Sequence, residues 1–147
     1  MDIVIVGAGI GGLTAASLLL ARGHRVRVLE QASQLGEVGA GIQMSANAVK
    51  VLKAVGVEST LEEKGVKPEA FEFRRFNTGE LLHRIPLGIS HLERHGACYY
   101  QMHRVDLHAA LVDTVLMGQP GAIELSCRVQ SVQEDAHSAG VTTSDGR

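Results

Sequence analysis

The residues of this chain best suited to chemistry form a glycine-rich turn near its start. An apolar run at residues 3–6 leads into the sequence GAGIGG at residues 7–12. At this spacing the first glycine permits a tight bend, the second leaves room for a pyrophosphate, and the third lets the next helix pack closely on the strand. The N–H groups that open the helix then face the phosphates. The pattern predicts a bound dinucleotide, against the alternative of an ordinary glycine-rich turn.

An acidic residue, Glu30, completes this pattern. It follows a second apolar run, residues 26–29, and lies near the offset of about twenty residues at which a carboxylate reaches a ribose diol. A carboxylate there repels a 2′-phosphate, so the position disfavours an NADP-type dinucleotide.

The elements that must position these residues read as a strand, a helix and a second strand. Residues 3–6 and 26–29 are short and rich in β-branched residues. Residues 11–22 carry apolar side chains at helical spacing, and Gly23 follows where a helix would end. This order predicts an α/β fold with a parallel sheet.

A second glycine-rich passage, residues 36–41, precedes an amphipathic helix. From spacing alone the passage is either a flexible connection or a backbone surface held close to a ligand. In the helix, Ser45 is the expected N-cap and Gly56 the expected stop. The apolar spacing predicts a buried face made of Ala48, Val51, Leu52 and Val55. A short helix is expected at residues 57–64.

The residue pattern changes in the middle of the chain. Alternating phenylalanines from Phe71, a turn signal at residues 77–79 and a second apolar run predict a β-hairpin over residues 71–86. His91 and His95 are spaced to share a helix face. We predict no metal site there, because no acidic or cysteine partner follows at ligand spacing.

Arg104 lies where a strand at residues 99–102 meets a helix at residues 105–117. The helix is expected to bury Leu107, Leu111 and Val115. A guanidinium at this junction reaches ligand phosphate or hydroxyl oxygens if the junction faces the first glycine turn, and otherwise forms a salt bridge with Asp106 or meets solvent. Further short strands are expected near residues 123–125, 129–132 and 141.

Composition excludes several classes of function. The chain has 147 residues, a formal net charge of −2 and a pI near 6.4. Its Lys and Arg residues are scattered, so we expect no nucleic-acid partner. Two distant cysteines, Cys98 and Cys127, suit neither a metal nor a disulfide framework and are expected to be reduced. No segment resembles an export signal or a membrane span, which favours a cytoplasmic protein.

Four segments, taken in order, resemble the N-terminal part of FAD-dependent aromatic hydroxylases. These segments are GAGIGG with Glu30-Gln31, GEVGAGIQ at 36–43, HRVDLHAAL at 103–111 and CRVQSV at 127–132. The family comprises single-component, class A flavoprotein monooxygenases such as salicylate hydroxylase and 3-hydroxybenzoate 6-hydroxylase. The resemblance spans essentially the whole chain. It implies that residues 1–147 are the N-terminal part of a Rossmann-like FAD-binding domain, with residues 1–66 and 97–147 as the nucleotide-binding portion and 67–96 as a β-hairpin insertion.

The resemblance also implies roles for individual residues. Residues 7–13 would hold the FAD pyrophosphate, Glu30 the adenosine ribose and Arg104 the phosphate or ribityl side of the flavin, with the adenine bordered by backbone near Val129. The implied cofactor-binding set is Gly7, Ala8, Gly9, Gly11, Gly12, Leu13, Glu30, Gln31, Gln43, Arg104 and Val129.

Gln43 is a departure within this set. The related hydroxynicotinate monooxygenases carry a histidine at the matching position, so Gln43 argues against that substrate class. The role left for Gln43 is a contact with the flavin or the substrate, because its side-chain amide has no acid–base capacity near neutral pH. No residue of the chain is assigned as catalytic, and no metal is expected.

The implied reaction is reduction of FAD by NADH or NADPH and transfer of one oxygen atom from O₂ to a phenolic or related aromatic substrate. Members of the family are longer than this chain, so it is expected to be a truncated piece. Alone it should be inactive, bind FAD weakly or not at all, and associate through exposed edges, including as a homo-oligomer. Two alternatives remain at this stage, namely a nicotinamide-dependent dehydrogenase and a non-catalytic dinucleotide-binding fragment.

Overall fold

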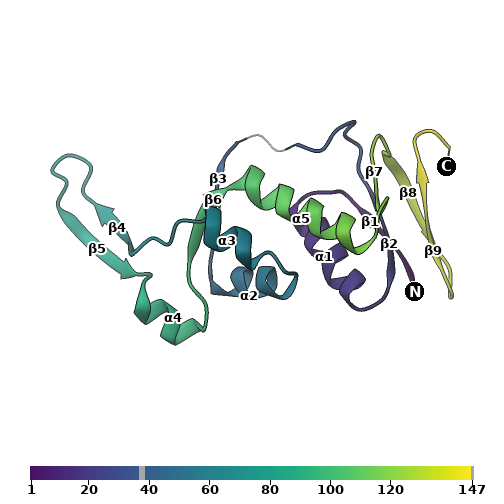
Figure 1. Ribbon diagram of the computed structural model, residues 1–147. Helices are drawn as coiled ribbons and strands as arrows, with labels where there is room; N and C mark the ends of the chain where they lie inside the picture. The colour runs from purple at the N-terminus through teal and green to yellow at the C-terminus, as the bar shows by residue number, and fades with distance from the viewer. Residues whose placement is uncertain (37–38, 147) are drawn as a thin grey trace. The chain divides into compact units, whose positions relative to one another are not determined.

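The computed structural model describes residues 1–36 and 39–146, and the chain forms two compact units (Figure 1). Unit 1 comprises Met1–Glu37 and His108–Arg147, and unit 2 comprises Val38–Leu107. Unit 1 is therefore discontinuous in sequence, whereas unit 2 is one continuous segment.

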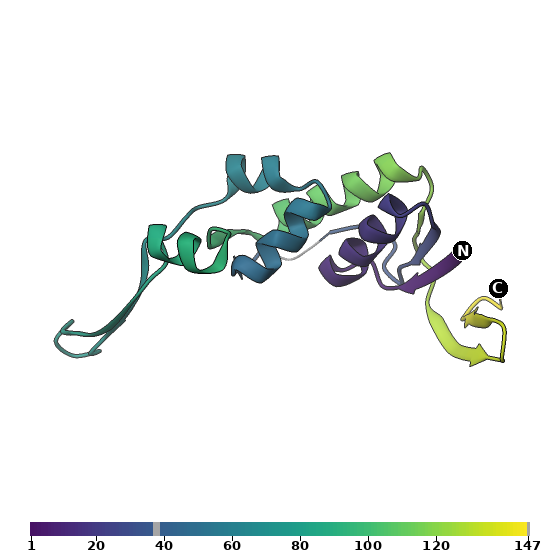
Figure 2. The same cartoon turned by 90° about the horizontal axis from the view of Figure 1, so that it is seen from below.

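Unit 1 is built on a three-stranded parallel sheet. Strands β1 (Asp2–Val6), β2 (Arg25–Leu29) and β7 (Ile123–Glu124) lie in the order β1-β2-β7. Helix α1 (Ile10–Ala21) connects β1 to β2, as a crossover between parallel strands requires, and lies alongside β1 (Figure 2). The predicted strand, helix and strand of the first thirty residues, and the α/β fold with a parallel sheet, are confirmed.

The core of unit 1 lies between this sheet and its helices. Helix α5 (Arg104–Gly118) belongs to unit 1 from His108 onward, and its Leu111 and Val115 are fully buried, as predicted. The other fully buried large side chains of the unit are Leu13, Val26 and Val28. Strand β1 is one edge of this sheet, and Val6 on it is 56% exposed.

An antiparallel hairpin ends unit 1. Strands β8 (Val129–Glu134) and β9 (Ala139–Thr143) pair with each other, and Asp135 closes the turn between them by accepting hydrogen bonds from the backbone N–H groups of His137 and Ser138. The strands expected near residues 129–132 and 141 are therefore present, as partners in one hairpin.

Unit 2 combines a strand pair with short helices. Strands β3 (Gly41–Met44) and β6 (Tyr100–His103) are antiparallel, and helices α2 (Ala46–Ala54) and α3 (Glu58–Lys64) follow β3. The sequence predicted the β6 strand and both helices. It did not predict β3, whose four residues come directly after the glycine-rich passage and pair with a strand far along the chain.

The predicted hairpin forms the most exposed part of unit 2. Strands β4 (Ala70–Arg74) and β5 (Leu81–Pro86) are antiparallel and make the two-stranded ribbon seen in Figures 1 and 2. Every residue of β5 is exposed, and so is Phe73. Helix α4 (Ile89–His95) follows the hairpin.

The predicted buried face of α2 is wrong in part. The helix buries Ala46, Val49 and Leu52, with Val55 buried just beyond its end, whereas Val51 is exposed. The helix begins at Ala46 and packs against α3, α4 and β3. Ser45 is at the N-cap as expected, but its hydroxyl bonds to the side chain of Asn47 and does not cap the helix.

Candidate functional site

The glycine turn between β1 and α1 has backbone geometry that restricts which residues it accepts. Gly7 has a φ of 98°, in the left-handed region that favours glycine, and its N–H donates to the Leu29 carbonyl at 2.8 Å. A Cβ on Gly12 would lie 2.1 Å from the Gly7 carbonyl oxygen and 3.3 Å from Ile5 Cγ2. The third glycine therefore permits close helix-to-strand packing, as the sequence pattern predicted.

The start of α1 is open to a ligand. Gly9 is the N-cap, and no side chain caps the helix within the described residues. A Cβ on Gly9 or Gly11 would meet nothing within 4 Å. The first N–H groups of a helix have no intrahelical partner, so this end can bind an anion. Leu13 contributes differently, because it is fully buried and its N–H already donates to the Gly9 carbonyl at 2.9 Å.

Glu30 lies at the end of β2 with its carboxylate already engaged. One oxygen accepts a hydrogen bond from the Ala8 N–H at 2.8 Å, and the other accepts one from the Ala32 N–H at 2.8 Å. These bonds, the one from Ala32 first, hold the pKa of Glu30 below its usual range. Each carboxylate oxygen has two acceptor positions, so both oxygens can still accept a bond from a hydroxyl group.

The backbone of Glu30 is held by a distant part of the chain. Its N–H donates to the Glu124 carbonyl at 2.8 Å, and its carbonyl accepts from the Cys127 N–H at 2.8 Å. Ser126, with a φ of 55°, donates from its N–H to the Ala32 carbonyl. The segment after β7 therefore fixes the end of β2 and the carboxylate on it.

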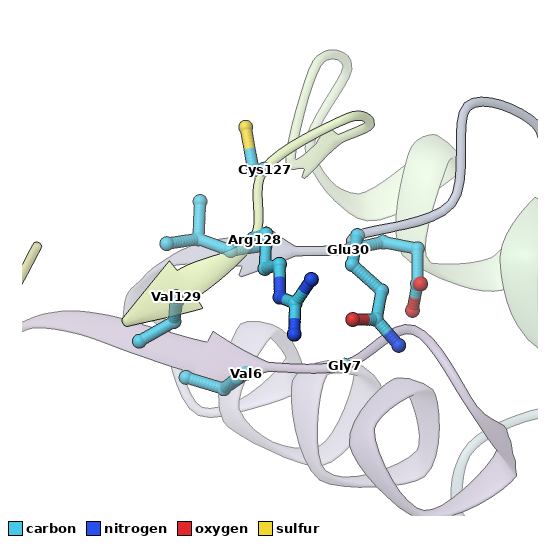
Figure 3. A pocket seen from close by; sticks show the side chains of 8 residues that line it. Val6, Gly7, Glu30, Cys127, Arg128 and Val129 are labelled. Atoms are coloured by element: carbon cyan, nitrogen blue, oxygen red, sulfur yellow. The ribbon is translucent and has the colours of Figure 1, made fainter. Parts of the chain in front are cut away.

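A cavity of about 330 Å³ opens beside this carboxylate (Figure 3). It is lined by Val6, Gly7, Leu29, Glu30, Gln31, Cys127, Arg128 and Val129. Figure 3 shows the guanidinium of Arg128 extending into the opening. Unit 1 thus brings together most residues of the predicted set, namely those of the glycine turn with Glu30, Gln31 and Val129.

The two remaining predicted residues, Gln43 and Arg104, belong to unit 2. Gln43 lies on β3, and its side-chain oxygen accepts a hydrogen bond from the Tyr99 hydroxyl at 3.0 Å. Arg104 opens α5, is exposed, and donates from its backbone N–H to the Ala40 carbonyl at 2.9 Å. Asp106, the alternative partner expected for Arg104, pairs with Lys64 at 2.9 Å.

The structure describes only part of the Gly36–Gly41 passage. Glu37 and Val38 lie outside the described residues. Its last glycine, Gly41, begins β3. The choice between a flexible connection and a surface held near a ligand stays open for the residues before that strand.

Sequence reasoning missed two residues of unit 1 that face this region. His108 is buried, and its Nε2 lies 2.7 Å from the Ala8 carbonyl oxygen. Arg128 lines the cavity directly before Val129. Both occur inside segments that carry the family resemblance, HRVDLHAAL and CRVQSV, and only their neighbours were singled out.

Within residues 1–36 and 39–146, no group of three or more His, Cys, Asp or Glu could hold a metal ion. His91 and His95 do share α4, with ring centroids 4.5 Å apart. Cys98 and Cys127 are not joined in a disulfide. No helix in the part that the structure describes is long and apolar enough to cross a membrane.

Known proteins similar to this chain include two monooxygenases and one protein of solved structure. The 3-amino-4-hydroxybenzoate 2-monooxygenase of Streptomyces cremeus is 41% identical over 144 residues, which are 98% of this chain and 36% of that protein. The 6-hydroxynicotinate 3-monooxygenase of Pseudomonas fluorescens is 44% identical over 113 residues, 77% of this chain and 29% of that protein. HpxO of Klebsiella pneumoniae, solved with FAD and uric acid, superposes with a TM-score of 0.85 at 28% identity, over 100% of this chain and 36% of its own.

The chain spans well under half the length of each of these proteins. All of residues 1–147 match one family, described as the FAD binding domain. The predicted resemblance to FAD-dependent aromatic hydroxylases, and FAD as their cofactor, are confirmed. This chain belongs to the FAD binding domain family.

Proposed function

We propose that this chain is the FAD-binding portion of an NADH- or NADPH-dependent flavoprotein monooxygenase that hydroxylates a phenolic or related aromatic substrate. The observation that carries the proposal is the constellation in unit 1, where the glycine turn, the Glu30 carboxylate and a cavity of about 330 Å³ lie together. The similarity to hydroxylases along the whole chain supports the same assignment.

The residues of unit 1 suit the adenosine diphosphate half of FAD. The open start of α1 offers N–H donors to the pyrophosphate. Glu30 offers charged acceptors to the ribose diol, and the cavity beside Gln31 and Val129 would take the adenine. Gly7, Gly12 and Leu13 shape the turn and its packing, and Gly11 leaves the open start of the helix unobstructed.

Two residues of the predicted set, Gln43 and Arg104, belong to unit 2. We assign Arg104 to a phosphate or ribityl oxygen and Gln43 to a flavin or substrate contact. The Gln43 side-chain oxygen is held by Tyr99, which leaves its two N–H groups as the donors that it could offer. FAD, when bound, supplies the redox chemistry of oxygen transfer, and the protein contributes binding and orientation.

The substrate stays a proposal at the level of a hydroxylated aromatic ring. The relatives named above act on 3-amino-4-hydroxybenzoate and 6-hydroxynicotinate. Gln43 still argues against hydroxynicotinate, although the identity to a 6-hydroxynicotinate 3-monooxygenase is 44%. We also propose that the protein is cytoplasmic, that its nucleotide-binding portion comprises residues 1–66 and 97–147, and that residues 67–96 are an insertion.

The binding step is testable on the chain itself. Titration with ADP up to millimolar concentration, followed by ¹H–¹⁵N NMR, should shift the amide signals of residues 7–12, Glu30 and Val129. FAD should bind weakly, since the chain covers about a third of its relatives. An unchanged spectrum at saturating ADP, or shifts confined to other regions, would contradict the proposal.

The catalytic step requires the longer protein. Purified parent protein should hold flavin and should consume NADH or NADPH faster when a hydroxylated aromatic acid is added. A panel containing 3-amino-4-hydroxybenzoate, 6-hydroxynicotinate and 3-hydroxybenzoate tests the substrate class, with the unhydroxylated benzoate as control. Reduction of NAD⁺ or NADP⁺ coupled to oxidation of an alcohol substrate, without any flavin, would favour the dehydrogenase alternative.

A further inference from the structure

His108 is a buried titratable side chain that the proposed function does not use. It lies on α5, is 6% exposed, and its Nε2 is 2.7 Å from the carbonyl oxygen of Ala8 in the glycine turn. A carbonyl oxygen only accepts hydrogen bonds, so Nε2 must carry the proton. The imidazole therefore donates a bond to the backbone of the turn.

The two peptide groups that flank Ala8 are held from different directions. The N–H of the Gly7–Ala8 peptide donates to the Glu30 carboxylate, and the carbonyl of the Ala8–Gly9 peptide accepts from His108. A trans peptide is planar, and its C=O and N–H point in opposite directions. When the Ala8 carbonyl turns toward His108, the Gly9 N–H turns away from it, at the open N-terminus of α1.

A further interaction must hold this orientation, because the backbone at Gly9 also tolerates the Ala8–Gly9 peptide rotated to the opposite direction. Rotation of the Ala8–Gly9 peptide would carry the φ of Gly9 from its present −75° to a positive value, which glycine tolerates because it has no Cβ. The rotated peptide would present a carbonyl oxygen in place of an N–H group. A carbonyl dipole repels a phosphate that the N–H would bind.

We propose that His108 is a positioning residue of the phosphate-binding turn, where its Nε2–H holds the Ala8 carbonyl so that the Gly9 N–H faces a ligand pyrophosphate. The inference rests on the proposed function and adds a residue to it. Glu30 and His108 then have separate tasks, since Glu30 binds the ribose and His108 sets the direction of a phosphate donor.

The variant His108→Leu fills a similar space and removes the donor, and His108→Gln restores an N–H donor. His137→Leu, at the exposed turn between β8 and β9, is the matched control. We expect His108→Leu to lower the affinity for ADP on the order of tenfold and the affinity for adenosine far less, because adenosine has no phosphate. His108→Gln should recover most of the ADP affinity, and His137→Leu should match the parent chain.

A second measurement needs no variant and no ligand. The ¹⁵N shifts of the His108 ring should identify a protonated Nε2 at neutral pH and a slowly exchanging Nε2–H. A neutral ring protonated at Nδ1 would overturn the inference, as would an equal loss of affinity for adenosine and ADP in His108→Leu. If the unsubstituted 147-residue chain binds neither ADP nor adenosine, the proposed function fails. Two observations then still decide whether His108 orients this peptide, namely which ring nitrogen of His108 is protonated and whether the Gly9 amide signal shifts in His108→Leu.

Discussion

The substitution Gly12→Ala tests the packing of the glycine turn directly. The added Cβ would lie 2.1 Å from the Gly7 carbonyl oxygen, although real Cβ atoms essentially never approach another heavy atom within 3.0 Å. The backbone of β1 or α1 would have to move by roughly 1 Å, and overpacking of this kind costs about 1–3 kcal/mol. We expect a value near the upper end, because the contacted atom is backbone and cannot rotate away.

Gly11→Ala is the matched control. Both glycines lie in the first turn of α1, so both substitutions gain the same helix propensity, up to about 1 kcal/mol. A Cβ on Gly11 meets nothing within 4 Å. The difference between the two variants therefore isolates the clash.

The assay is urea unfolding followed by circular dichroism, with the free energy of unfolding taken from the midpoint and slope. Gly11→Ala should be as stable as the parent chain or slightly more stable, and Gly12→Ala should be less stable than Gly11→Ala by on the order of 3 kcal/mol. Equal stabilities in the two variants would refute the close approach of α1 to the turn.

Three further predictions concern charge and exposed surface. Glu30→Gln should raise the affinity for 2′-phosphorylated ADP relative to ADP, measured by competition titration, because the repelling carboxylate is gone. Hydrogen bonds lower the pKa of Glu30, so its contribution to stability is complete above the usual carboxyl pKa and is lost as the pH falls through the lowered one. A pH series of unfolding free energies should therefore fall less steeply on the acid side in Glu30→Gln, and an unchanged slope would contradict this. Phe76→Ser should leave stability within about 0.5 kcal/mol and reduce self-association in sedimentation, because Phe76 is 100% exposed.

The parts of the fold that the sequence could predict are those with local signals. The first strand, helix and strand follow from periodicity and glycine placement, and the β4–β5 hairpin follows from alternation around a turn signal. Strand β3 could not be predicted, because its four residues gain their structure from pairing with β6, far along the chain. The buried face of α2 was assigned partly wrongly, since Val49 and Val51 are both apolar and only the contacts with neighbouring elements decide which is buried.

The residues of the candidate site also differ in whether a local sequence pattern could predict them. Gly12 and Glu30 could be predicted because each has a residue-specific task set by a short-range pattern. His108 could not, because its significance lies in a single bond to the backbone one hundred residues earlier. Arg128 likewise lacks a local signal, and only its place in the cavity marks it.

The discontinuity of unit 1 has a consequence for the order of folding. β2 cannot gain its second neighbour until Ile123 has been synthesised, whereas unit 2 is a continuous segment whose strand and helix partners are all made earlier. Because domains fold as they emerge and long-range pairings form slowly, unit 2 should acquire structure first. In pulsed hydrogen exchange during refolding, amides of α2 should gain protection before those of Val28 and Glu30, which donate to the distant carbonyls of Ala122 and Glu124. The glycine turn would then be completed late, when the segment after β7 closes over Glu30.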